Sequence, residues 1–184
     1  MRTRRVFSLL VLTGCFTLVV GPSEAQAPAR TPGRGGAAAP QAEATLAQLM
    51  KGILFPNSNV IFAAQSQDPA KVPEAKDPSV ATDPLANTYG KWEAVENSSL
   101  ALAEAANLLT IPGRKCSNGL PVPMGNADWP KFVQGMRDAG MKAYKAAQSK
   151  DMDKILDAAD TMTTACANCH EKYREKPTLA DRCK

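Results

Sequence analysis

Apolar residues recur at every third or fourth position along most of the chain after residue 41, which is the period of one face of an α-helix. Four stretches carry this pattern, over residues 42–64, 84–111, 128–148 and 151–173. In the last stretch the apolar positions step by four, three, four, three and four residues, close to the 3.5-residue repeat of helices packed side by side. The pattern therefore predicts an all-α protein folded as an antiparallel four-helix bundle.

The first helix is the least regular in this pattern, and a long connection separates it from the second. Pro56 interrupts the first, so that segment is either a kinked helix or two shorter helices. Residues 66–82 contain three prolines among mixed charges and predict a long exposed connection. Asp83 and Pro84 are suited to an N-cap and a first-turn proline, so the second helix is expected to begin there and to end before Pro112. Its expected inward residues are Leu85, Tyr89, Trp92, Val95, Ser99, Leu102, Ala106 and Leu109.

The last two helices have clear ends in the sequence. Asp128 and Asp151 occupy the expected N-cap positions, and Pro130 falls in the first turn of the third helix. Only Ser149 and Lys150 separate the two helices, so they are expected to be antiparallel neighbours. Their expected inward residues are Phe132, Met136, Ala139, Ala143 and Ala147 in the third helix, and Ile155, Ala159, Met162, Cys166, Cys169 and Tyr173 in the fourth.

The first 41 residues do not share the helical pattern. Three arginines precede an apolar run of about 15 residues, and a Gly-Pro pair and small residues follow, as in a secretory signal peptide. We therefore expect a signal peptide over residues 1–25, a flexible tether over 26–41 and one domain over 42–184, exported to the periplasm. An alternative is lipidation of Cys15, which would tether the protein to a membrane, although apolar residues continue after this cysteine.

Charge and composition exclude several functions. The 184 residues contain 22 basic and 18 acidic side chains, a net charge of +4, with no basic block or stripe. This distribution argues against nucleic-acid binding. The chain has a single histidine and no obvious pair of convergent carboxylates, so acid–base catalysis is not expected and the protein is not predicted to be an enzyme.

The chemistry of the chain is concentrated in its last predicted helix. Cys166, Cys169 and His170 form a C-x-x-C-H sequence, the pattern of covalent haem attachment in c-type cytochromes. Cysteines three residues apart project from one helix face, so both sulfurs can reach the two vinyl groups of one porphyrin. The adjacent imidazole is then placed to bind the iron as the proximal ligand. The sequence predicts one covalently attached haem c.

Two other interpretations of these cysteines remain open. A thiol redox C-x-x-C normally opens a helix after a β-strand, and no strand is predicted before this one. A structural zinc site needs four ligands, and Cys116 and Cys183 would have to join the C-x-x-C-H residues to complete it. Haem attachment is favoured over both, and export agrees with it.

Counting cysteines gives a second prediction. Cys15 belongs to the signal segment, and two further cysteines are assigned to haem, so Cys116 and Cys183 are left over. Unpaired thiols are uncommon in an oxidising compartment. We expect Cys116 and Cys183 to form a disulfide that ties the loop before the third helix to the C-terminus, the alternative being two free cysteines.

The haem segment resembles a known family. Cys166, Cys169 and His170, followed by Tyr173 and Arg174 at the end of the last of four helices, are similar to the cytochrome c′ family, which includes low-spin members with a Met iron ligand. The resemblance covers roughly residues 42–176 and implies a periplasmic four-helix bundle with haem near one end. Arg174 matches the basic residue that the family places near the proximal ligand. The long Pro-rich connection and the two extra cysteines depart from the family pattern.

The same resemblance concerns the sixth iron ligand. In the family this position is filled from the first helix, and Met50 lies on the inward face of that helix here. The segment Leu-Met-Lys-Gly-Ile is similar to the ligand-bearing segment of the Met-ligated branch. Met50 is therefore expected to bind the iron, although Met is also a common core residue. The other residues weighed for this position are Leu46, Leu49, Ile53, Met124, Met136, Met141, Met152 and Met162.

These features predict an electron carrier, because an iron with both axial positions filled by protein has no open site for substrate. A thioether opposite an imidazole also favours ferrous iron. The expected partners are periplasmic redox proteins, and the resemblance raises the question of a homodimer. The alternative function is a five-coordinate cytochrome c′ that binds nitric oxide or carbon monoxide. A third is a membrane-tethered haem subunit, favoured only if Cys15 is lipidated.

Overall fold

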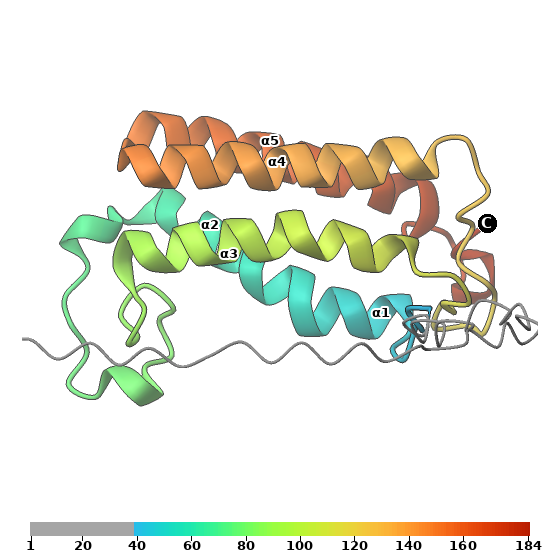
Figure 1. Ribbon diagram of the computed structural model, residues 1–184, viewed down its shortest axis with the longest axis horizontal. Coiled ribbons are helices and arrows are strands. Elements are labelled where there is room, and N and C mark those ends of the chain that lie inside the picture. Colours follow the sequence, from blue (N-terminus) through green and yellow to red (C-terminus); the bar gives the residue numbers. More distant parts are fainter. Residues whose placement is uncertain (1–38) are drawn as a thin grey trace, which may run out of the picture. The chain divides into compact units, whose positions relative to one another are not determined.

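Four long helical segments make up most of residues 39–184, the part of the chain that the computed structural model describes (Figure 1). The first comprises α1 (Leu46–Leu49), a π-helical turn (Met50–Leu54) and α2 (Phe55–Ser66). The others are α3 (Lys91–Ala105), α4 (Trp129–Ser149) and α5 (Met152–Tyr173), and a 3-10 turn (Ala106–Thr110) extends α3. The proposed signal peptide, Cys15 and nearly all of the proposed tether lie outside the described residues.

The helices pack side by side. α3 lies against α4, α4 against α5, and α2 against both α3 and α5. α4 and α5 are antiparallel neighbours joined by Lys150 and Asp151, as the short connection predicts (Figure 1). No β-strand occurs within residues 39–184, where the only β-type pairing is an isolated bridge between Lys115 and Pro121. The prediction of an all-helical protein with four main helices is confirmed.

Pro56 does not break the first helix. The helix begins at Leu46, four residues later than expected, where Thr45 and Gln48 form a capping box. Just before the proline, the helix widens into the π-helical turn, in which the Phe55 N–H donates to the Met50 carbonyl. Since proline has no N–H to donate, a local change of hydrogen-bond spacing lets the helix continue through it. The segment is thus one helix with an irregular turn, and not two helices.

The connection to α3 differs from the prediction. Two short 3-10 turns (Pro69–Lys71 and Pro78–Val80) interrupt it, and Pro69 and Val72 are buried, so it is only partly exposed. Asp83 caps a turn through a hydrogen bond from the Leu85 N–H (2.8 Å), and α3 starts only at Lys91.

A fold-back of residues 84–90 explains this later start. The Lys91 N–H donates to the Leu85 carbonyl at 2.7 Å, and a Cβ on Gly90 would lie 2.4 Å from that same oxygen. Glycine is therefore required at the bend. The prediction that Tyr89 faces inward is wrong, because it precedes α3 and its side chain is 66% exposed.

The core forms along the predicted inward faces. Val95, Leu102, Ile155 and Met162 are fully buried, and the apolar positions expected in α4 pack on the same core. Asp151 caps α5 as predicted, accepting hydrogen bonds from the Asp153 and Lys154 N–H groups. Asp128 occupies the N-cap position of α4, but its side chain makes no capping bond there and instead contacts α5.

Candidate functional site

A cavity of about 820 Å³ lies between the first helix and the C-terminal half of α5. α2 contacts α5, whereas the π-helical turn packs against α3, and the first helix diverges from α5 toward its N-terminus (Figure 1). Large apolar side chains from all four helical segments form most of the wall, and this size and lining are typical of a site for a small organic ligand. The apolar lining residues include Leu46, Leu54, Phe62, Leu102, Leu109, Trp129, Phe132, Val133 and Met136.

The C-x-x-C-H residues line this cavity from α5. Cys166 and Cys169 are three positions apart near the end of the helix, so their side chains lie on one face, and His170 follows directly. All three side chains are partly buried. Within residues 39–184 these are the two cysteines outside a disulfide. The structure thus presents two thiols and one imidazole to a single, largely apolar space.

Burial sets the protonation of these groups. Burial is the largest cause of the raised pKa of Cys166. It is also the largest cause of the raised pKa of Cys169, which reaches about 11. Burial, followed by the nearby Arg174 cation, lowers the pKa of His170. Both thiols are therefore protonated at neutral pH and the imidazole is neutral, with a lone pair free to bind a metal. Reactive redox dithiols have a lowered pKa, so this environment disfavours the thiol redox interpretation.

Met50 and Arg174 also line the cavity. Met50 comes from the π-helical turn of the first helix, whereas Arg174 follows the last residue of α5. The Arg174 side chain is about half exposed and pairs with Glu175 at 2.8 Å. The five residues predicted to bind the cofactor, from two segments more than 100 positions apart in the sequence, thus share one cavity.

The structure narrows the candidates for the sixth ligand. Among the methionines of the described residues, Met50 and Met136 line the cavity. Met136 comes from α4, which packs directly beside α5, while Met50 comes from the helix that diverges from α5. Leu46 also lines the cavity, whereas Leu49 is buried in the core and Ile53 packs against that core.

An aromatic cluster closes the end of the cavity where α5 meets the start of α4. Tyr173 is buried, and its ring meets Trp129 and Phe132 edge-to-face at centroid distances of 5.3 and 6.1 Å. The Tyr173 hydroxyl donates a hydrogen bond to Asp128 and accepts one from the Asn126 amide at 3.2 Å. Tyr173 thereby fixes the helix end that carries His170.

The C-terminal segment after α5 folds back over the cavity. A disulfide joins Cys183 to Cys116, as the cysteine count predicts, and both cysteines line the cavity. The Cys183 N–H donates to the Tyr173 carbonyl at 2.8 Å, which holds the segment against the end of α5. The zinc interpretation needed Cys116 and Cys183 as ligands, and these two sulfurs are bonded to each other.

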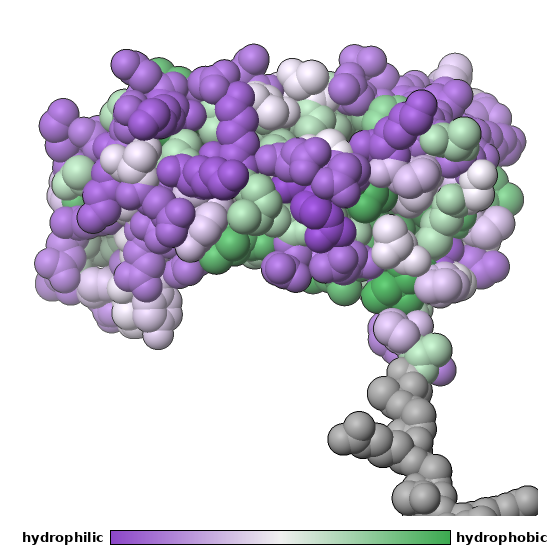
Figure 2. Space-filling view, turned by 45° about the horizontal axis from the view of Figure 1, so that its top comes forward, coloured by the Kyte–Doolittle hydropathy of each residue, from purple (hydrophilic) through white to green (hydrophobic). Residues whose placement is uncertain are grey.

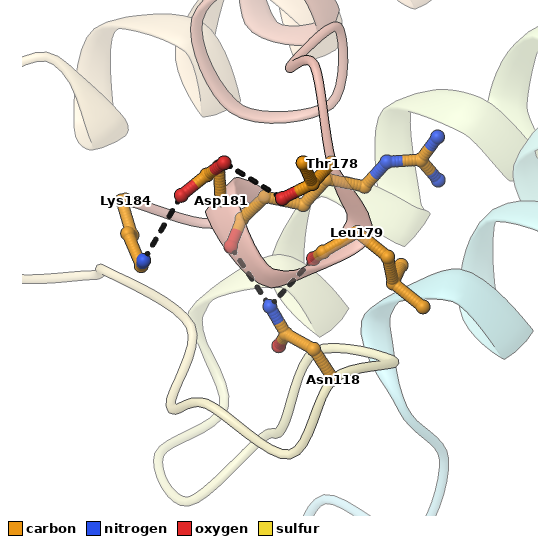
Figure 3. A network of polar contacts seen from close by, with 6 residues as sticks. Asn118, Thr178, Leu179, Asp181 and Lys184 are labelled. Carbon is orange, nitrogen blue, oxygen red and sulfur yellow. Dashed lines mark hydrogen bonds and ion pairs between the residues drawn. The ribbon is translucent and has the colours of Figure 1, made fainter.

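Polar contacts fasten the same segment to the loop before α4 (Figure 3). The Asn118 amide donates to the carbonyls of Leu179 (3.0 Å) and Arg182 (3.1 Å). Asp181 in turn accepts hydrogen bonds from Thr178 (2.7 Å) and Lys184 (3.2 Å). These bonds order the last residues of the chain, and the side chains of Leu179 and Arg182 complete one wall of the cavity.

Sequence reasoning missed two parts of the wall. Leu54, Phe55, Ser58 and Phe62 line the cavity from one side of α2 and the residue just before it, whereas the apolar pattern of the sequence follows Val60, Ile61 and Ala64 on another side of this helix. The C-terminal segment has no apolar period, and Cys183 was the one signal that placed it near residue 116.

The face drawn in Figure 2 is mainly hydrophilic, with hydrophobic residues showing in small groups between hydrophilic ones. Within residues 39–184, no helix has the length and apolar character needed to cross a membrane. The same residues contain no group of three or more His, Cys, Asp or Glu side chains placed to hold a metal ion.

Comparisons with family models, curated proteins and solved structures found no match to the chain.

Proposed function

We propose that this protein is an exported monohaem c-type cytochrome that carries electrons between periplasmic redox proteins. The observation that carries the proposal is that Cys166, Cys169, His170 and Met50 line one largely apolar cavity of about 820 Å³. Cys166 and Cys169 would hold haem c through thioether bonds, and His170 and Met50 would bind its iron. The packing of the four helices supports the expected antiparallel bundle with its cofactor near the end of the last helix.

The residues present fit such a group. The two thiols that would form the thioethers are protonated and unpaired, while Cys116 and Cys183 are bonded to each other. Mainly apolar and aromatic side chains line the cavity, and neutral His170 can donate its lone pair to a metal. Lys51, Arg174 and Arg182 offer positive charge to the carboxylates that a haem carries.

The protein's own contribution is to fix the ligands and shield the centre. Bound haem would supply a one-electron iron couple, and binding of the iron by a thioether and an imidazole would raise its reduction potential. Tyr173 holds the end of α5 in place through its hydrogen bonds to Asp128 and Asn126. The C-terminal segment, pinned by the Cys116–Cys183 disulfide, covers one side. A site whose ligands are held in place in this way suits electron transfer, since little has to rearrange when the charge changes.

Export is supported by two features. The N-terminal residues have the charged, apolar and small-residue order of a signal peptide. The disulfide belongs to an oxidising compartment such as the periplasm, which is also where haem c is attached in bacteria.

The test is the absorption spectrum of the mature protein made together with the c-type maturation machinery. We expect a pigment that stays with the protein in acidified acetone, low-spin ferric and ferrous spectra, and a weak long-wavelength ferric band from sulfur-to-iron charge transfer. Met50→Leu should remove that band and open the iron to carbon monoxide. Met136→Leu, which alters the other methionine of the cavity, should leave the band in place.

The outcomes separate the alternatives. A colourless protein, or a pigment lost to acidified acetone, would refute haem attachment. A high-spin wild-type spectrum with ready carbon monoxide binding would replace the electron carrier by the five-coordinate gas-binding protein. Loss of the band in Met136→Leu, with no change in Met50→Leu, would assign the ligand to α4.

A further inference from the structure

The first helix has an unusual register of buried residues. Leu49 and Leu54 are both buried, at 4% and 6% exposure, although they are five positions apart. In an α-helix of 3.6 residues per turn, side chains five positions apart point about 140° away from each other. Both can be buried here because the π-helical turn Met50–Leu54 inserts one extra residue between them.

Pro56 gives this turn a local cause. The Phe55 N–H donates to the Met50 carbonyl, five residues back, and Pro56 has no N–H for the next bond. The Asn57 side-chain amide donates to the Ile53 carbonyl at 2.7 Å, which adds a side-chain hydrogen bond next to the proline. Gly52 lies in the middle of the turn, is exposed, and has no neighbour within 4 Å of its Cβ position. The extra residue therefore bulges into open space.

The turn decides which way Met50 points. α2 is anchored by the buried side chains Val60, Ile61 and Ala64, so regularising the turn would rotate the part of the helix before it by about 100°. In an unbroken α-helix, the Met50 side chain would rotate toward the core and take the place that the buried Leu49 side chain fills now. Lys51, which already lines the cavity, would then take the direction that Met50 has now.

We propose that Pro56 is a positioning residue for the iron ligand: it sets the π-helical turn, and the turn aims Met50 into the cavity. This inference rests on the proposed function, since it assumes that Met50 binds haem iron. π-Bulges occur often at functional sites, and here the bulge links a residue outside the cavity lining to the residue expected to bind the metal.

The experiment removes the proline and then compensates for the extra residue. Pro56→Ala restores the N–H, so the helix can close its regular bond to the Gly52 carbonyl, and we expect loss of the sulfur-to-iron band in the ferric holoprotein. Deleting Gly52 in the Pro56→Ala background shortens the regular helix by one residue and returns Met50 to its original direction, so the band should return. Pro130→Ala, in the first turn of α4 where a proline replaces no helical bond, is the control that should keep the band.

The outcomes distinguish this inference from the proposed function. If Met50→Leu leaves the wild-type band unchanged, the ligand assignment itself fails. If Met50→Leu removes the band but Pro56→Ala keeps it, the positioning role of Pro56 is overturned while the function stands. If the band is lost in Pro56→Ala and does not return when Gly52 is deleted, the loss reflects general damage and the inference is also overturned. If Pro56→Ala fails to fold, the variant that also lacks Gly52 decides the question alone. Its band would support the inference, and a folded holoprotein without the band would overturn it.

Discussion

Gly140 lies on the face of α4 that packs against α3, at a point where the two backbones approach closely. A Cβ added there would lie 2.8 Å from the Ala103 backbone nitrogen and 3.0 Å from the Ser99 carbonyl oxygen. Neither atom belongs to a flexible side chain, so an alanine could fit only if the helices moved apart. The two helices form one of the main contacts of the fold, and Ser99 is fully buried in it.

The expected size of the effect follows from two opposing contributions. Replacing glycine by alanine within a helix stabilises by about 1 kcal/mol through helix propensity. Forcing extra volume into a packed contact costs about 1–3 kcal/mol, and contact with backbone atoms places this case at the upper end. We expect Gly140→Ala to lower the free energy of unfolding by about 1–2 kcal/mol.

Gly135 provides a matched control on the same helix. Its Cβ position has no neighbour within 4 Å, so Gly135→Ala should keep the propensity gain of about 1 kcal/mol with no packing cost. Urea unfolding of the two holoprotein variants, followed by circular dichroism, measures both changes, provided that the dependence on denaturant stays the same. If Gly140→Ala proves as stable as Gly135→Ala, the close approach of α3 and α4 described here is wrong.

Two further predictions concern the C-terminal segment and α5. Replacing Cys116 and Cys183 by serine opens a crosslink spanning 67 residues, which in the chain-entropy model should cost about 4 kcal/mol of unfolding free energy. Urea unfolding of the oxidised wild type and the double variant measures this, and a loss below about 1 kcal/mol would mean that the disulfide constrains the unfolded chain little. At the start of α5, the Lys154 N–H is the main group that lowers the pKa of Asp151 below its ordinary 3.8. The ionised cap therefore stabilises the fold above pH 3.8, and this contribution is lost as the pH falls through the lowered pKa. Wild type should be more stable than Asp151→Asn at neutral pH and the difference should shrink in that acidic window; a difference independent of pH would contradict the charge argument.

The sequence alone was sufficient for the regular parts of the fold. The 3.6-residue period of α4 and α5 identified their inward faces, and Asp151 and the two-residue turn between them defined their ends and their antiparallel pairing. These features are local, since a helix face and a cap depend on residues a few positions apart. The motif Cys166, Cys169 and His170 was equally local, and the cysteine count identified Cys116 and Cys183 as partners because the alternatives were few.

Only the tertiary structure decided where the first helix points and what surrounds the motif. A one-residue bulge before Pro56 rotates the side-chain directions of all preceding helix residues by about 100° about the helix axis. A count of apolar spacing along the sequence cannot detect this rotation. The late start of α3 depends on the contact between Gly90 and the Leu85 carbonyl, and the cavity wall depends on a C-terminal segment held by Asn118 and a disulfide. These contacts join residues whose positions are set by packing of the whole chain, so no short stretch of sequence contains the information that fixes them.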